Sequence, residues 1–171
     1  MARQRESLRA RRAVARAARY GVRHDRHHPR RPRSRRRVEV VVDASVAVKW
    51  LIPEHGSVRA ASLRTEELFA PRLIRAEVAN TLATLERRGE FSATAAAEAF
   101  ALFQDAPLRI TETDEDLERA ALAMAIRLRH PVHDCSYLSL AERVDATLVT
   151  ADRRFVATLV GDVAAARAAA L

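Results

Sequence analysis

Short apolar segments alternate with helix-like segments along residues 38–171, and this alternation constrains the fold more than any other feature. Helical periodicity separates the apolar segments, most clearly over residues 71–89 and 114–130. Strands that alternate with helices form a parallel sheet covered on both faces. We therefore predict an α/β fold, a three-layer α/β/α sandwich with a central parallel sheet. The segments with the length and composition of short buried strands are VEVVVD, FA before Pro71, PLRITET and ATLVTAD.

Charge is divided unevenly between two parts of the chain. Residues 1–37 carry fifteen arginines against Glu6 and Asp25, a net charge of +13, whereas residues 38–171 carry 15 Lys and Arg against 20 Asp and Glu, a net charge of −5. We expect a basic N-terminal extension over 1–37, disordered in isolation, and one globular domain over 38–171. Three interpretations of the extension stay open: an arm that binds nucleic acid through arginine, a solvated appendage, or upstream sequence included by a misassigned start.

Several other protein classes lack support in the sequence. No apolar stretch approaches the roughly 20 residues of a membrane-spanning helix, and the N-terminus lacks the apolar core of a secretory signal. The single cysteine, Cys135, cannot form an internal disulfide, which fits a reducing compartment. We expect a cytoplasmic protein that does not bind membranes. With only 4 glycines, the chain has no glycine-rich loop that could cradle a nucleotide phosphate.

Two aspartates follow predicted strands. Asp43 ends the apolar run VEVVV, and Asp152 comes directly after ATLVTA, with Thr150 beside it. The carboxyl ends of parallel strands meet at one edge of a sheet, where ligands of open α/β folds bind. Both aspartates also precede helix-like segments, so each has a structural interpretation as a helix N-cap.

Two further acids lie in helix-like segments. Glu77 is placed beside the apolar face of the helix at 71–89, among neutral polar residues that include Asn80. Asp134 stands where a helix begins after Pro131. The structural interpretations are a boundary glutamate that reaches water and a third N-cap. Taken singly, neither residue indicates a function.

Together the four carboxylates indicate a metal site. Each like-charge pair at about 4 Å costs roughly 1 kcal/mol in water and about 4 kcal/mol at an effective dielectric of 20, so their convergence calls for a cation. Ligation by oxygen alone selects a hard ion, Mg²⁺ or Mn²⁺. His133 and Cys135 do not form a rival zinc site, since no second His/Cys pair stands at zinc-finger spacing.

Three stretches resemble PIN-domain ribonucleases, and among these the VapC toxins of bacterial type II toxin–antitoxin pairs. They are VVDASVAVKWLIPE, APRLIRAEVANTL and HPVHDCSYLSLAERVDATLVTADRRF, and they run in the family's order. The resemblance implies a PIN-like α/β/α domain over 38–171. It also implies a ribonuclease that hydrolyses RNA phosphodiester bonds with Mg²⁺ or Mn²⁺, forms a homodimer, and is held inactive by a cognate antitoxin protein.

The resemblance also implies roles for individual residues. The four acids correspond to the family's catalytic carboxylates: Asp43, Glu77, Asp134 and Asp152. Asp43, Asp134 and Asp152 are expected to hold the metal, and Glu77 either joins them or orients the attacking water. Ser45 and Thr150 fall where the family has hydroxyls that support the site, and Asn80 matches a residue near the helical glutamate.

The sequence departs from the family at both ends, and one alternative function stays open. Residues 1–37 have no family counterpart, and the alanine-rich GDVAAARAAAL leaves open whether a fifth strand forms. The alternative function is a non-catalytic α/β regulatory module, or a nucleic-acid-binding module that works through its basic tail. A phosphoacceptor domain would carry an acidic pair after its first strand, whereas VVDAS carries one acid. Deleting residues 1–37 would separate a nuclease from a tail-based binder.

Overall fold

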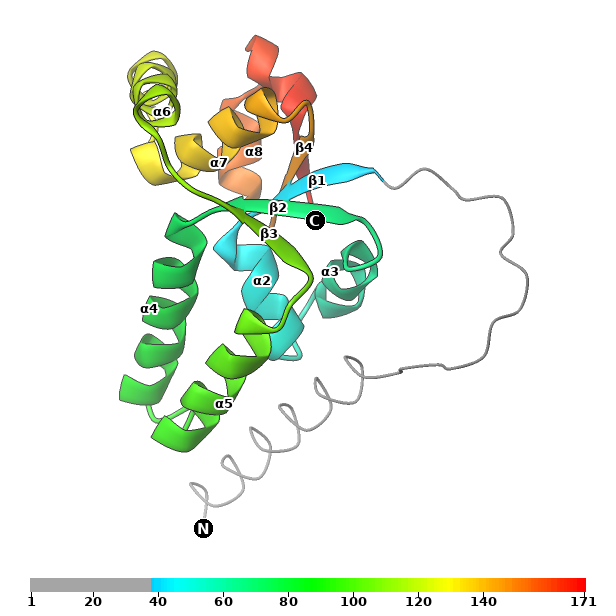
Figure 1. Cartoon of the computed structure of the whole chain (residues 1–171), viewed down its shortest axis with the longest axis vertical. Helices are drawn as coiled ribbons and strands as arrows, with labels where there is room; N and C mark the ends of the chain where they lie inside the picture. Colours follow the sequence, from blue (N-terminus) through cyan, green and yellow to red (C-terminus); the bar gives the residue numbers. More distant parts are fainter. Residues whose placement is uncertain (1–37) are drawn as a thin grey trace, which may run out of the picture.

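The computed structural model describes residues 38–171 (Figure 1). The predictions for residues 1–37 lie outside these described residues. Within them, five parallel strands form one sheet in the order β3-β2-β1-β4-β5. The strands are β1 (Glu39–Val42), β2 (Glu67–Pro71), β3 (Leu108–Thr111), β4 (Thr147–Thr150) and β5 (Ala168–Ala170).

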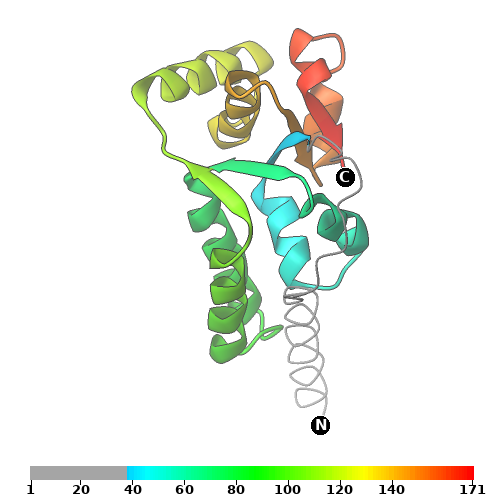
Figure 2. The same cartoon turned by 45° about the vertical axis from the view of Figure 1, so that its right-hand side comes forward.

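Helices cover both faces of the sheet, as Figures 1 and 2 show. The first face carries α2 (Ala44–Leu51), α3 (Ser57–Leu63), α4 (Leu73–Arg87) and α5 (Ala93–Gln104). The second carries α6 (Glu115–Leu128), α7 (Val132–Arg143) and α8 (Arg153–Thr158), and a 3₁₀ helix, Val163–Arg167, leads into β5. The predicted three-layer α/β/α sandwich with a central parallel sheet is confirmed.

The core forms where the apolar segments predict it. Val40, Val41 and Val42 of β1 are all buried, because a central parallel strand is covered on both faces. Helix α7 lies against β1, β2 and β4, and its middle residues are almost entirely buried. No helix within residues 38–171 is long and apolar enough to cross a membrane.

A fifth strand does form. Ala168, Ala169 and Ala170 of β5 pair in parallel with Leu148, Val149 and Thr150 of β4. Alanine has little intrinsic preference for strands, so the pairing depends on the neighbouring strand and not on the local sequence. The alanine-rich end therefore gave no strand signal of its own.

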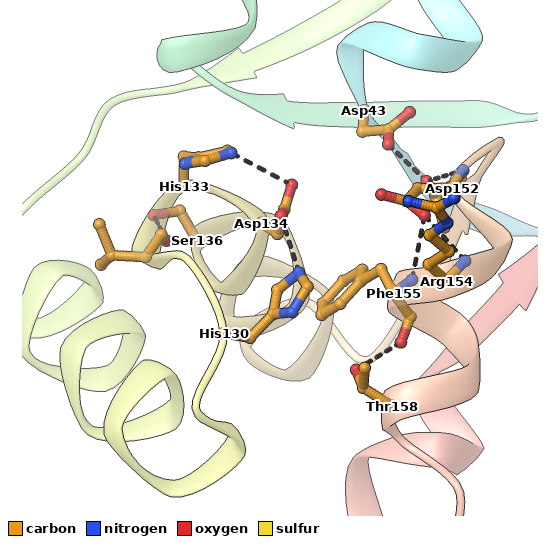
Figure 3. Close-up of polar contacts among 11 residues, drawn as sticks. Asp43, His130, His133, Asp134, Ser136, Asp152, Arg154, Phe155 and Thr158 are labelled. Carbon is orange, nitrogen blue, oxygen red and sulfur yellow. Dashed lines mark hydrogen bonds and ion pairs between the residues drawn. The ribbon is translucent and has the colours of Figure 1, made fainter.

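The order of the strands fixes where a ligand could bind. The chain runs outward from β1 through β2 to β3, and then crosses to β4 on the other side of β1. The order therefore reverses between β1 and β4, and a crevice at the carboxyl ends of these two strands is the usual ligand position in open α/β sheets. Asp43 follows β1 there, and Asp152 follows β4 (Figure 3).

Candidate functional site

Asp43 is both a helix cap and the centre of a hydrogen-bond network. Its Oδ1 atom accepts from the backbone N–H of Val46 at 3.0 Å, which caps α2, and from the Ser45 hydroxyl at 2.6 Å. Its Oδ2 atom accepts from the Thr150 hydroxyl at 2.6 Å. Asp43 therefore caps α2 and lies at the candidate site at the same time, so the two interpretations are compatible.

The two hydroxyls connect Asp43 to the chain that follows β4. Ser45 Oγ accepts from the backbone N–H of Ala151 at 2.9 Å, and Thr150 Oγ1 accepts from that of Asp152 at 2.9 Å. Each hydroxyl thus accepts from a backbone amide after β4 and donates its proton to Asp43. These bonds fix the Asp43 carboxylate across the boundary between β1 and β4. A supporting role for Ser45 and Thr150 at a metal site stays a prediction.

The surroundings of Asp43 oppose its negative charge. Burial raises the pKa of the Asp43 carboxyl above its usual range, and the nearby Asp134 carboxylate raises it further. The three hydrogen bonds that Asp43 accepts lower its pKa in part, but burial outweighs them. A cation at this position would relieve the unfavourable charge.

Glu77 extends from α4 toward α7, and its carboxylate lies half-buried against Tyr137. The Tyr137 hydroxyl donates to Glu77 Oε2 at 2.5 Å. Burial raises the pKa of Glu77, and the carboxylates of Asp43 and Asp134 add to the rise, while the bond from Tyr137 and the nearby His133 oppose it. The structure thus places the negative charges of Glu77, Asp43 and Asp134 within electrostatic reach of one another.

Asp134 lies in the first turn of α7, which begins at Val132, so it does not cap the helix. Two histidines flank its carboxylate (Figure 3). His130 Nε2 is 2.8 Å from Oδ2, and His133 Nε2 is 3.6 Å from Oδ1. Asp134 therefore presents a partly exposed carboxylate between two imidazole rings.

Asp152 and Asn80 lie nearer the solvent. Asp152 caps α8, where its Oδ1 atom accepts from the backbone N–H groups of Arg154 and Phe155, and its side chain lies at the edge that Asp43 occupies (Figure 3). Asn80 is exposed on α4 about one turn after Glu77. In the described part of the chain, no hydrogen bond joins the Asn80 side chain to the acids. The roles of both residues stay predictions.

The donors around this edge fit a hard divalent cation by type and by charge. All are carboxylate oxygens, and burial raises the pKa values of two of the acids, Asp43 and Glu77. Within residues 38–171, no group of three or more His, Cys, Asp or Glu side chains has the spacing to hold a metal ion directly. Mg²⁺ often binds through one or two carboxylates and keeps several waters, so this spacing is compatible with it. The three-carboxylate ligand set stays a prediction.

Two residues that contact the acids were not predicted. Tyr137 lies 60 positions from Glu77, and the sequence alone indicates a core residue of α7. His130 precedes a proline at the corner between α6 and α7. Polar residues are common at such corners, so the sequence did not single it out. A weak signal was available for Tyr137, because a buried phenol hydroxyl nearly always has a hydrogen-bond partner.

Comparison with known proteins gives one family and consistent relatives. The sequence profile of the PIN domain matches residues 40–158. Ribonuclease VapC3 from Pyrobaculum aerophilum is 34% identical over 122 residues, which are 68% of this chain and 92% of that protein. The PIN domain match over residues 40–158 includes all four candidate acids.

Solved structures share the fold. The crystal structure of PAE2754 from Pyrobaculum aerophilum has a TM-score of 0.57 at 24% identity, and the match covers 71% of this chain and 79% of that one. A toxin–antitoxin complex from Klebsiella pneumoniae has a TM-score of 0.50 at 11% identity, covering 73% and 93%. With its sequence profile, its curated relative and its fold in agreement, this chain belongs to the PIN domain family.

Proposed function

We propose that this protein is a metal-dependent endoribonuclease and acts as the toxin of a toxin–antitoxin pair. The observation that carries the proposal is the proximity of Asp43, Glu77 and Asp134 at the carboxyl edge of the sheet, where two hydroxyls hold the Asp43 carboxylate in place. Membership of the PIN domain family and similarity to a ribonuclease support the same reaction. A divalent ion, Mg²⁺ or Mn²⁺, would supply Lewis acidity at the phosphate and activate water as the nucleophile.

The side chains of the site would have different roles in holding the ion and orienting the water. Asp43 and Asp134 would hold the ion, with Asp152 contributing directly or through water, and Glu77 would hold the ion or orient the attacking water. Ser45 and Thr150 keep the Asp43 carboxylate in one orientation, since each donates to one of its oxygens. A carboxylate fixed in this way loses little entropy when a cation binds.

Positive charge beside the acids would bind the RNA backbone. Arg153 and Arg154 follow Asp152 and are exposed. Arginine contacts phosphate oxygens without reading base sequence. These two residues would therefore position the RNA but would not select the cleavage site. They would also offset the net charge of −5 on residues 38–171, which otherwise repels RNA.

The partners we propose are an RNA substrate, a cognate antitoxin protein and a second copy of the chain. Similarity of the fold to a toxin–antitoxin complex supports the antitoxin. The exposed apolar side chains of Leu122 and Ile126, one turn apart on α6, support self-association. The buried free thiol of Cys135 fits a reducing cytoplasm, where such a ribonuclease would meet its substrate.

Deletion of residues 1–37 separates the nuclease from the tail-based alternative. We propose that residues 38–171 form the complete nuclease domain, and we expect this fragment to cleave RNA at low salt. The full chain should bind RNA more tightly, with a steeper dependence of log K on log salt, because fifteen arginines can displace counterions.

Cleavage assays and filter binding over a series of salt concentrations measure both properties, with circular dichroism to confirm that the fragment folds. A folded fragment that has lost all cleavage would favour a function located in the tail. Equal salt slopes for the two proteins would show that the tail does not contact RNA.

A further inference from the structure

The carboxylate of Asp134 is held on one side by a histidine that the proposed reaction does not use. His130 Nε2 lies 2.8 Å from Asp134 Oδ2. An ionised carboxylate can only accept hydrogen bonds, so the Nε2–H group of His130 is the donor. His133 is 3.6 Å from Oδ1, and 51% of its side chain is exposed, so it is the weaker contact.

The ring of His130 is itself held in place. It stacks on the ring of Phe155, with centroids 4.4 Å apart and planes inclined by 20°. Phe155 is 2% exposed and lies on α8, the helix that Asp152 caps. His130 therefore connects the acid on α7 to the element that carries the acid after β4 (Figure 3).

The backbone at the corner between α6 and α7 fixes the other end of His130. The His130 N–H group donates to the carbonyl of Ala125 at 3.1 Å. Arg129, which ends α6, has a left-handed φ of 51°, and Pro131 follows with its restricted φ. The corner thus fixes the backbone of His130, and the contacts with Phe155 and Asp134 hold its ring.

We propose that His130 is a positioning residue for the metal site. By donating to Asp134 Oδ2 and stacking on Phe155, it would leave Oδ1 available to hold the cation and fix the position of Asp134 relative to α8. The inference rests on the proposed function, because it assumes that the acids bind a divalent ion. Groups that orient a ligating side chain in this way typically change metal affinity by about 10–100-fold when removed.

The test measures Mn²⁺ affinity and does not depend on RNA cleavage. We expect His130→Ala in the full chain to weaken Mn²⁺ binding by about 10-fold, measured from the electron paramagnetic resonance signal of free Mn²⁺. His130→Gln keeps an N–H donor and should recover most of the affinity. The matched control is His55→Ala, an exposed histidine in the loop between α2 and α3, which should bind Mn²⁺ like the wild type.

A second variant tests the support from Phe155. Phe155→Leu keeps an apolar side chain but removes the flat face on which the imidazole rests. It should weaken Mn²⁺ binding when His130 is present and have little further effect in the His130→Ala background, because the two residues act through one contact. Additive effects would contradict the proposed link, and circular dichroism confirms that each variant is folded.

The possible outcomes distinguish this inference from the proposed function. Wild-type protein that binds no Mn²⁺ would overturn both. Suppose that Asp43→Asn weakens Mn²⁺ binding and that folded His130→Ala binds Mn²⁺ like the wild type. This result would overturn the positioning role alone. If Mn²⁺ affinity falls in His130→Ala and recovers in His130→Gln, the positioning role is supported. A purely structural disturbance of the corner would not be repaired by an amide donor.

Discussion

Replacing Asp43 with Asn is expected to lower metal-dependent RNA cleavage by at least about 100-fold while the fold stays intact. Loss of a group that only orients a metal ligand costs about 10–100-fold, and loss of a ligand should cost more. Asn is as good an N-cap as Asp, so α2 should keep its first turn. The change therefore removes the negative charge from the centre of the site without removing the cap.

The measurement is the rate of cleavage of a mixed RNA pool by the full chain, with Mg²⁺ or Mn²⁺ and with chelator. Asp114→Asn is the matched control, because Asp114 caps α6 through the backbone N–H of Leu117 and pairs with Arg143, outside the acidic cluster. It should cleave RNA at the wild-type rate. Undiminished turnover by a folded Asp43→Asn protein would end the assignment of the metal site.

The sequence predicted the parts of the site that depend on topology. In a parallel sheet, residues that follow neighbouring strands meet whatever their separation along the chain. Asp43 and Thr150 are 107 positions apart, yet the hydroxyl of one reaches the carboxylate of the other. The alternation of strands and helices was therefore enough to predict the edge of the sheet at which these side chains meet.

The sequence could not predict contacts that depend on how helices are placed on the sheet. The bond from Tyr137 to Glu77 joins α7 on one face to α4 on the other, and no local pattern signals it. The stack of His130 on Phe155 depends on the corner between α6 and α7 meeting α8. Pairing of β5 likewise depends on β4, because its alanines carry no strand preference of their own.

Metal-free protein is expected to become more stable when Asp43 is replaced by Asn, because the folded state disfavours the negative charge that the proposed reaction would use. The folded state raises the pKa of Asp43 above its ordinary 3.8 and that of Glu77 above its ordinary 4.5. A raised pKa in the folded state means that the stability contributed by the protonated group is lost as pH rises through that pKa. At neutral pH both acids therefore destabilise the protein that holds no ion.

The sign is opposite for acids with lowered pKa values. The hydrogen bonds from Arg143 and from the backbone of Leu117 lower the pKa of Asp114 to about 2, and the backbone bond from Ala164 lowers that of Asp162. These groups stabilise the fold above pH 3.8 and lose that effect in more acidic solution. Their contribution changes below the pH range in which Asp43 and Glu77 act, so the two effects can be separated.

Thermal unfolding in chelator as a function of pH measures both effects. Asp43→Asn should have a higher Tm than wild type at pH near 7, and the difference should shrink as pH falls toward the ordinary carboxyl range, where wild-type Asp43 is protonated. Asp114→Asn should show the reverse, a lower Tm at neutral pH. Mn²⁺ should raise the Tm of wild type and have much less effect on Asp43→Asn, because a ligand that binds the folded state stabilises it by RT ln(1 + [L]/Kd), which is larger when the affinity is higher. If Asp43→Asn lost stability at neutral pH in chelator, the carboxylate would serve the fold, and the charge held at this edge would not be a cost that a cation has to offset.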